Sequence, residues 1–273
     1  MKSILTPTDF SEQSINAFKY ALSIAKLSKS KVILLHVYQI PVVPADVPVS
    51  IDYVQLEKEN QNALIAFEAQ LRQKLNYTIE LECIAKWGFV TDEINNVVHE
   101  KSIDLIVMGI TGAGKLGELL IGSNSTSVIK NIDCPTLIVP INAKFKGVQS
   151  IALATDLEKI KHGHALSQIK KIIKLFNSKL MILNVIDPSE IPDFQKAVSG
   201  INLENTFGEI EHSFHLQGNN DIIYGINDFI DNNNIDMLIM LPKKHSLFSI
   251  LFKESKTKKM AFHTHIPLLA IHE

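Results

Sequence analysis

Short apolar runs alternate along the chain with longer segments in which apolar residues recur at helical spacing. Runs of about five to seven apolar residues are typical of strands buried on both faces, and the longer segments are typical of helices that cover a sheet. The alternation therefore predicts an α/β protein with an open parallel sheet. In the first half it predicts five strands, at residues 3–8, 31–37, 79–86, 104–109 and 136–140.

Helices are predicted between these runs. The first is expected over residues 10–27, with Ser11 as its N-cap and with Phe18 on its apolar face. Two more are expected over residues 52–74 and 91–100, and a short helix precedes the fifth strand.

The strand pattern starts again in the second half. SIALATD at residues 150–156 is similar to SILTPTD at 3–9, and DMLIM at 236–240 is similar to DLIVM at 104–108. The alignment that places Asp104 on Asp236 extends through the last part of the two halves without a gap. Between the second and third strands the second copy lacks about 18 residues, so its second helix should be much shorter. Self-similarity at half the chain length indicates a duplicated domain.

We therefore predict two tandem open-sheet domains, residues 1–145 and 146–273. Each is expected to be a five-stranded parallel β-sheet with helices on both faces, because β-α-β crossovers are right-handed. The strand order 3-2-1-4-5 is expected by analogy with other open α/β sheets.

Composition and charge limit the possible partners. The chain is 46% hydrophobic and 21% charged, with a formal net charge of −2, so no broad basic surface is available for nucleic acid or anionic lipid. No apolar run approaches the roughly 18–20 residues that span a bilayer. Cys83 and Cys134 lie in or beside apolar runs and are expected to be buried, reduced thiols. With no apolar signal segment at the start, we expect a cytoplasmic protein that binds neither nucleic acid nor membrane.

A glycine-rich segment, residues 109–125, follows the fourth predicted strand. GxxxxGK fits Gly109–Lys115, but a Walker A loop needs Ser or Thr where Leu116 stands. GxGxxG fits residues 112–117, but that fingerprint belongs after a first strand and needs a later acidic partner. A third pattern, GxxGx9GS, fits in full and in the right place. Its positions are Gly109, Gly112, Gly122 and Ser123.

The chemistry of this segment suits a phosphate group. Glycines let the backbone approach an anion without interference from Cβ. Ser123, Asn124 and Ser125 stand where a helix begins, so their amides and hydroxyls and the helix dipole favour negative charge there. An ordinary turn after a strand is the alternative for the glycines.

Thr8 and Asp9 end the first predicted strand, beside the point where open α/β sheets bind ligands. A carboxylate there can accept from ribose hydroxyls or reach a cation through water. Alternatively, Asp9 only caps the following helix. His36 lies within the second strand and is interpreted as a packed or hydrogen-bonded residue, and no catalytic residue is assigned.

Three segments together resemble the universal stress protein family: PTDFSE after the first strand, the glycine spacing, and CPTLIVP closing the first half. The resemblance covers nearly the whole chain as two tandem copies. It implies ATP as the ligand, with a divalent cation such as Mg²⁺. It also implies that Asp9 lies near this ligand and that backbone groups at Val37 meet the adenine edge.

The resemblance also bears on assembly. Each fifth strand would otherwise be an exposed sheet edge, which proteins usually cover or pair. In the family, fifth strands pair across a dimer axis, which implies an internal pseudo-dimer of the two domains here. A further homodimer is not readable from the sequence.

The second copy departs from the pattern. Under the alignment of Asp104 with Asp236, Gly109, Gly112 and Gly122 become Leu241, Lys244 and Glu254. Side chains obstruct a close backbone approach, and a glutamate repels phosphate. Asp156 is retained, but we predict no ATP in this half. The second half also holds eight of the ten histidines, without a spacing typical of metal sites, so no metal site is assigned.

The sequence thus predicts an ATP-binding, nucleotide-sensing stress-response protein with little or no turnover. A weak ATPase is one alternative, because bound phosphates beside a cation are partly activated by positioning and charge neutralisation. An interaction scaffold with vestigial sites is the other.

Overall fold

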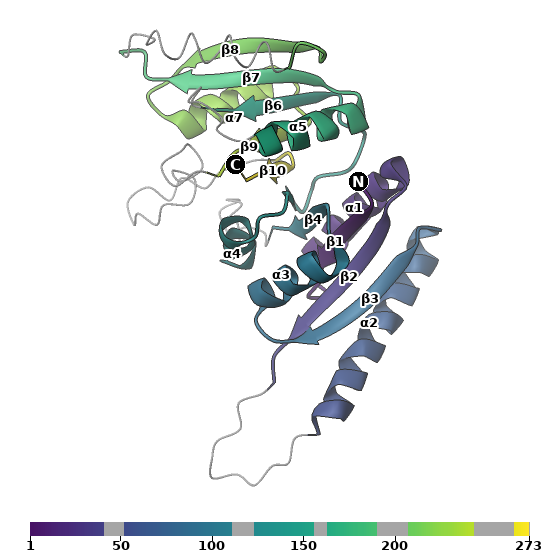
Figure 1. Ribbon diagram of the computed structural model, residues 1–273. Coiled ribbons are helices and arrows are strands. Elements are labelled where there is room, and N and C mark those ends of the chain that lie inside the picture. Colours follow the sequence, from purple (N-terminus) through teal and green to yellow (C-terminus); the bar gives the residue numbers. More distant parts are fainter. Residues whose placement is uncertain (41–51, 111–122, 156–162, 190–206, 243–264, 273) are drawn as a thin grey trace, which may run out of the picture.

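A computed structural model describes residues 1–40, 52–110, 123–155, 163–189, 207–242 and 265–272 of the chain (Figure 1). Strands and helices alternate in both halves. The first half contains β1 (Ser3–Pro7), α1 (Glu12–Ser28), β2 (Lys31–Tyr38), α2 (Tyr53–Leu75), β3 (Leu81–Trp87), α3 (Val90–Lys101), β4 (Leu105–Gly109), α4 (Ser123–Asn131) and β5 (Thr136–Val139). The second contains β6 (Ser150–Ala154), α5 (Gly163–Phe176), β7 (Lys179–Ile186), β8 (His212–Gly218), α7 (Ile222–Asn232), β9 (Met237–Met240) and β10 (Leu268–Ala270).

All ten of these strands form one sheet, in the order β3-β2-β1-β4-β5-β10-β9-β6-β7-β8. The first half therefore has the predicted order 3-2-1-4-5, and the second half repeats it. Within each half every strand pair is parallel. The predicted α/β architecture of two tandem open sheets is confirmed.

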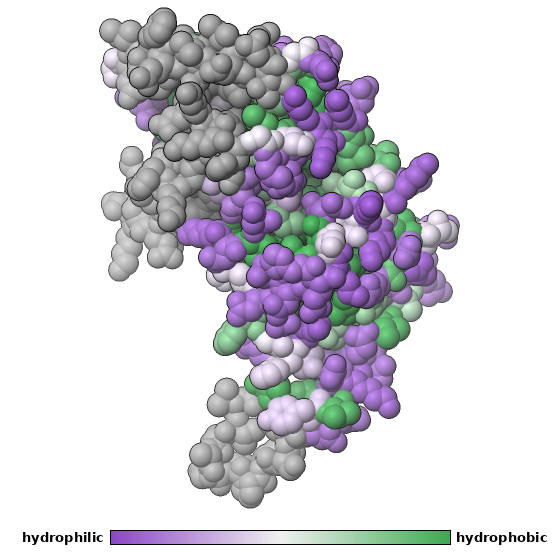
Figure 2. Space-filling view, in the orientation of Figure 1, coloured by the Kyte–Doolittle hydropathy of each residue, from purple (hydrophilic) through white to green (hydrophobic). Residues whose placement is uncertain are grey.

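The inner strands are buried on both faces, as the apolar runs predict, whereas β3 and β8 are partly exposed. In β2, Val32 and Leu34 belong to the core on one face, and Ile33 and Leu35 belong to the core on the other. This alternation follows from the two-residue period of a strand. On the side of the molecule shown in Figure 2, hydrophilic residues dominate and hydrophobic residues are scattered between them.

Helix α1 forms where its capping residues allow it. The Ser11 side chain accepts a hydrogen bond from the Ser14 amide at 3.3 Å, so Ser11 is the N-cap that the sequence predicts. The helix ends at Lys29, which adopts the left-handed conformation that closes many helices. Its buried face includes Phe18 and Ile24, and this packing fixes the segment that follows β1 against the sheet.

Strand β4 begins at Leu105, one residue later than predicted. Asp104, just before it, binds the start of β1 through its side chain. Its carboxylate accepts hydrogen bonds from the backbone amides of Lys2 and Ser3. Asp236, the equivalent residue of the second copy, accepts in the same way from Gln149 and Ser150. Both copies thus use an aspartate to tie the start of the fourth strand to the start of the first.

The two halves join through their fifth strands, which lie antiparallel in the middle of the sheet. Leu137 lies directly opposite Leu269, and these two residues occupy equivalent positions in the two copies. The pairing is therefore symmetric about a local twofold axis. Equivalent residues of the two copies lie near this axis. Ile24 and Ile172 are one such pair, Leu105 and Met237 are another, and all four line one small crevice.

The predicted short second helix of the second copy falls largely within residues 190–206, outside the described residues. No helix among the described segments is long and apolar enough to cross a membrane.

Strands β3 and β8 are the two edges of the sheet. One side chain of α2 is hydrogen-bonded to the outer backbone groups of β3. The Gln61 carboxamide of α2 donates to the Cys83 carbonyl at 2.9 Å and accepts from the Ala85 amide at 2.8 Å. One residue of a parallel neighbouring strand would make the same two bonds. Gln61 therefore occupies two of the pairing groups that the exposed edge of β3 offers to another chain.

We expect Gln61→Leu to remove both bonds and to lower the free energy of unfolding by about 1–3 kcal/mol. Urea unfolding measures this change. Because the edge becomes available, light scattering should also show concentration-dependent self-association. Gln55→Leu is the matched control, since Gln55 lies exposed on the same helix and its side chain donates to Glu59, while its backbone amide donates to Asp52 in either variant. Equal behaviour of the two variants would contradict the role assigned to Gln61.

Candidate functional site

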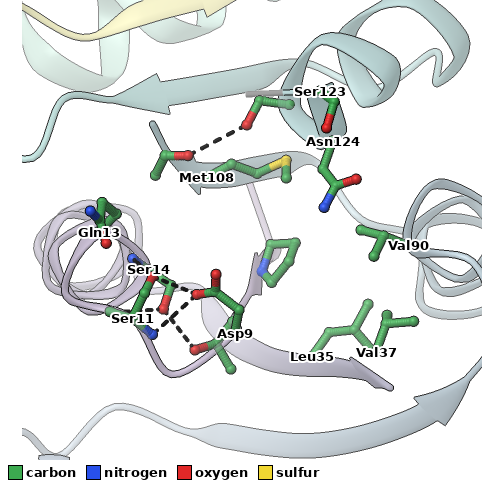
Figure 3. Close-up of a pocket in the computed structure, with 14 residues that line it drawn as sticks. Asp9, Ser11, Gln13, Ser14, Leu35, Val37, Val90, Met108, Ser123 and Asn124 are labelled. Atoms are coloured by element: carbon green, nitrogen blue, oxygen red, sulfur yellow. Dashed lines mark hydrogen bonds between the residues drawn. The ribbon is translucent and has the colours of Figure 1, made fainter. Parts of the chain in front are cut away.

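A pocket opens at the carboxyl ends of β1, β2 and β4, beside the first turns of α1, α3 and α4 (Figure 3). This is the switch point where open α/β sheets bind ligands. Seven of the predicted site residues line it: Thr8, Asp9, Val37, Gly109, Ser123, Asn124 and Ser125. The two remaining ones, Gly112 and Gly122, lie outside the described residues.

The pocket has walls of different character. Leu35 and Val37 from β2 lie with Val90 on one side, and Asp9, Ser11 and Ser14 lie on the opposite side (Figure 3). Ser123 and Asn124 of α4 border a third side. An apolar wall facing polar groups is the arrangement that suits a ligand with a flat apolar part and a polar part.

Asp9 is held by the N-cap of α1. Its Oδ1 accepts from the Ser11 hydroxyl at 2.5 Å and from the Ser11 backbone amide at 3.1 Å. Partial burial alone would raise the pKa of Asp9, but hydrogen bonds, chiefly those from Ser11, outweigh it and hold the pKa below its ordinary value. The carboxylate is therefore ionised at neutral pH. Asp9 is not the N-cap itself, because Ser11 fills that place.

The Thr8 hydroxyl is used inside the protein. Ser14 Oγ donates to the Ser11 carbonyl at 2.9 Å, so the contact of 2.9 Å between Thr8 Oγ1 and Ser14 Oγ is a donation by Thr8. Thr8 Oγ1 also accepts from the Phe10 amide at 3.0 Å. Because the Thr8 hydroxyl donates to Ser14, it is not available to donate to a ligand in the pocket. Thr8 therefore stabilises the loop that carries Asp9.

Gly109 makes room for helix α1. A Cβ atom at this position would lie 2.4 Å from the Gln13 carbonyl oxygen. The glycine that was singled out for phosphate thus has a packing role of its own, because it lets the first turn of α1 approach the end of β4. In the second half Leu241 takes the corresponding position and is buried in the core.

The first turn of α4 contributes polar groups to the pocket. Ser123 and Asn124 are exposed, whereas Ser125 is buried and its hydroxyl donates to the Gly109 carbonyl at 3.4 Å. The amino end of a helix carries unpaired amides and a partial positive charge. The turn is therefore suited to an anionic group.

His36 behaves as the sequence predicts. Its Nδ1 lies 2.9 Å from the Thr8 carbonyl oxygen, and its ring packs on Phe10 at 4.4 Å between centroids. It does not line the pocket, and its hydrogen bond anchors the end of β1.

Sequence reasoning missed part of the pocket lining. The missed residues are Pro7, Ser11, Gln13, Ser14, Leu35, Val90 and Met108. Ser11, Gln13 and Ser14 had a usable signal, because they are polar residues of a helix that begins just after Asp9. Val90 had none, since it reaches the pocket only through the placement of α3.

Among the described residues, no group of three or more His, Cys, Asp or Glu side chains could hold a metal ion. Cys83 and Cys134 are free thiols. Burial raises the pKa of Cys83 to about 11 and that of Cys134 to about 12, so both stay protonated and unreactive.

Comparison with known proteins agrees with this architecture. The universal stress protein family model matches residues 1–140. The chain belongs to the universal stress protein family. Universal stress protein MJ0531 of Methanocaldococcus jannaschii is 36% identical over 141 residues, which cover 50% of this chain and 81% of that protein.

Solved structures match as well. A universal stress protein from Archaeoglobus fulgidus is similar over 99% of this chain and 98% of its own, with a TM-score of 0.74 and 19% identity, which supports the two-copy fold. A universal stress protein solved in complex with cAMP covers 50% of this chain and 96% of its own, with 26% identity and a TM-score of 0.39.

We expect Gly109→Ala to lower the free energy of unfolding by about 1–3 kcal/mol, because the new Cβ must push α1 away from β4. Chemical denaturation followed by circular dichroism measures the change. Gly163→Ala is the matched control, since a Cβ there would have no atom within 4 Å. If Gly109→Ala were as stable as Gly163→Ala, the close approach would not constrain the site.

Proposed function

We propose that the first half binds ATP in the pocket formed by β1, β2, β4 and the first turn of α4. The observation that carries the proposal is the convergence of an ionised Asp9 and the α4 amino end on one pocket with an apolar wall. In this pose the base packs against Leu35, Val37 and Val90, and backbone groups at Val37 meet its edge. Asp9 accepts from the ribose hydroxyls.

The phosphates are assigned to Ser123, Asn124 and Ser125, whose helix end attracts anions. Gly112 and Gly122 complete this assignment from the sequence. Mg²⁺ fits the chemistry of the donors, because it is usually held by one or two carboxylates together with substrate phosphates. Asp9 is the one carboxylate among the described residues that line the pocket, so it would hold the ion directly or through water.

We further propose that the protein senses nucleotide with little or no turnover. No His, Cys, Lys or Arg side chain is among the described residues lining the pocket. Asp9 is a weak general base because its pKa is held low. The two unpaired cysteines of the chain suit the reducing cytoplasm, where a nucleotide-sensing stress response would take place.

The domain boundaries 1–145 and 146–273, and the pairing of the two domains as an internal pseudo-dimer, are part of the same proposal. The symmetric antiparallel contact of β5 with β10 supports them. We assign one nucleotide site to each chain, because the second copy carries Leu241 in place of Gly109 and Glu254 in place of Gly122.

Calorimetric titration with ATP and Mg²⁺ tests the proposal, and we expect one ATP per chain. Asp9→Ala should weaken binding about tenfold or more, because a charge-assisted hydrogen bond is lost. Asp156→Ala, at the corresponding position of the second copy, should leave binding unchanged. Gly122→Glu, which copies Glu254, should abolish it.

Other outcomes separate the alternatives. The absence of ATP binding by calorimetry, together with an unchanged melting temperature in ATP, would favour the interaction scaffold. Phosphate release that disappears in Asp9→Ala would establish the weak ATPase instead. Equal weakening by Asp9→Ala and Asp156→Ala would contradict the assignment of the site to the first half.

A further inference from the structure

Phe10 has an unusual backbone conformation, with a φ of 65°. The described structure contains five other non-glycine residues with positive φ, namely Lys29, Asn76, Ser102, Asn177 and Asn234. All five follow the end of a helix, where a left-handed residue is common. Phe10 instead precedes a helix, and a bulky aromatic residue is unfavourable in this region. Other contacts must therefore stabilise Phe10 in this backbone conformation.

The ring of Phe10 supplies that hold. It lies 4.4 Å from the ring of His36 on β2 and 4.9 Å from the ring of Phe67 on α2, measured between centroids. The Phe10 amide donates to Thr8 Oγ1 at 3.0 Å. Contacts to two separate elements thus fix a residue whose own backbone preference opposes its conformation.

The loop is fixed on both sides of Asp9. Before it, the Thr8 carbonyl is bonded to His36 and the Thr8 amide donates to the Leu35 carbonyl at 2.8 Å. After it, Phe10 is held by its ring. Asp9 is therefore the one residue between two anchors, and the path of the backbone decides where its carboxylate lies relative to Ser11 and the pocket.

The second half keeps one anchor in a different form. Asn184, which corresponds to His36, donates to the Thr155 carbonyl at 2.8 Å. The hydrogen bond beneath the end of the first strand is thus common to both copies, although Asn184 has no ring on which another could pack. In the first half the hydrogen bond is accompanied by the ring contact of His36 with Phe10.

From this geometry we propose that Phe10 is a positioning residue, whose ring, packed between His36 and Phe67, directs the Asp9 carboxylate toward Ser11 and the nucleotide pocket. The part of this inference that concerns affinity rests on the proposed ATP site. The part that concerns the Asp9 loop is independent of any ligand.

The decisive variant is Phe10→Gly, because glycine adopts a positive φ without strain, so the variant removes the Phe10 side chain without adding backbone strain. Phe18→Ala is the control. Phe18 is a fully buried aromatic residue of α1 whose ring lies 5.7 Å from that of Tyr77, measured between centroids. Its loss weakens core packing, but the variant retains the Phe10 ring and its partners His36 and Phe67. Both variants are compared at a temperature at which circular dichroism shows that they are folded.

Two measurements are made on each protein. The pKa of the Asp9 carboxyl group, followed by carbon-13 NMR, should rise toward its ordinary value in Phe10→Gly and stay unchanged in Phe18→Ala. The dissociation constant for ATP should increase about tenfold in Phe10→Gly and less than twofold in Phe18→Ala.

An unchanged Asp9 pKa in Phe10→Gly would overturn the proposal, as would equal shifts in the two variants. Failure of the unmodified protein to bind ATP would overturn the proposed function, but the NMR comparison would still decide whether Phe10 positions Asp9. The two ideas can therefore fail separately.

Discussion

The close approach of helix α1 to the end of strand β4 is the contact on which the site depends. It is permitted because Gly109 has no Cβ, which would lie 2.4 Å from the Gln13 carbonyl oxygen. The approach brings the loop that carries Asp9 next to the strand that leads to α4. Polar groups from the first and fourth strands therefore share one pocket, although they lie far apart in the sequence.

The two halves of the sheet pack symmetrically, but they differ at the ends of their fourth strands. The contact of β5 with β10 is centred on Leu137 and Leu269, and the paired aspartates Asp104 and Asp236 tie each copy together in the same way. These features concern folding, and both copies keep them. Gly109 concerns the site, and the second copy has replaced it with a buried leucine. The two copies thus share the packing of the sheet and differ at the position where, in the first copy, the fourth strand approaches the first helix.

The loop after β1 combines several weak interactions into one defined geometry. The hydroxyls of Thr8 and Ser14, the N-cap Ser11 and the ring of Phe10 each constrain a different atom of the loop. A carboxylate placed this way stays ionised at neutral pH and suits binding better than proton transfer. The same geometry therefore supports the proposal that the pocket holds a ligand with little or no turnover.

The sequence by itself determined the architecture of this protein. Its apolar runs are typical of buried strands and its two halves repeat, and the right-handed crossover places helices on both faces. The strand order 3-2-1-4-5 follows by analogy with other open α/β sheets. It also gathered seven residues that prove to line one pocket. Six of them follow from the strand ends and the helix start at one edge of the sheet, and Val37 follows from the family resemblance. The symmetric meeting of Leu137 and Leu269 required coordinates, since a register between distant strands is set by packing.

Only the tertiary structure decided the roles of individual residues. The sequence marks Gly109 as a phosphate-loop glycine, Thr8 as a ligand residue and Phe10 as an ordinary helix residue. In the structure Gly109 lets α1 approach β4, the Thr8 hydroxyl is hydrogen-bonded to Ser14, and Phe10 is held in a left-handed conformation. Each of these roles depends on an atom from another element or turn, and a one-dimensional pattern does not specify which atoms meet.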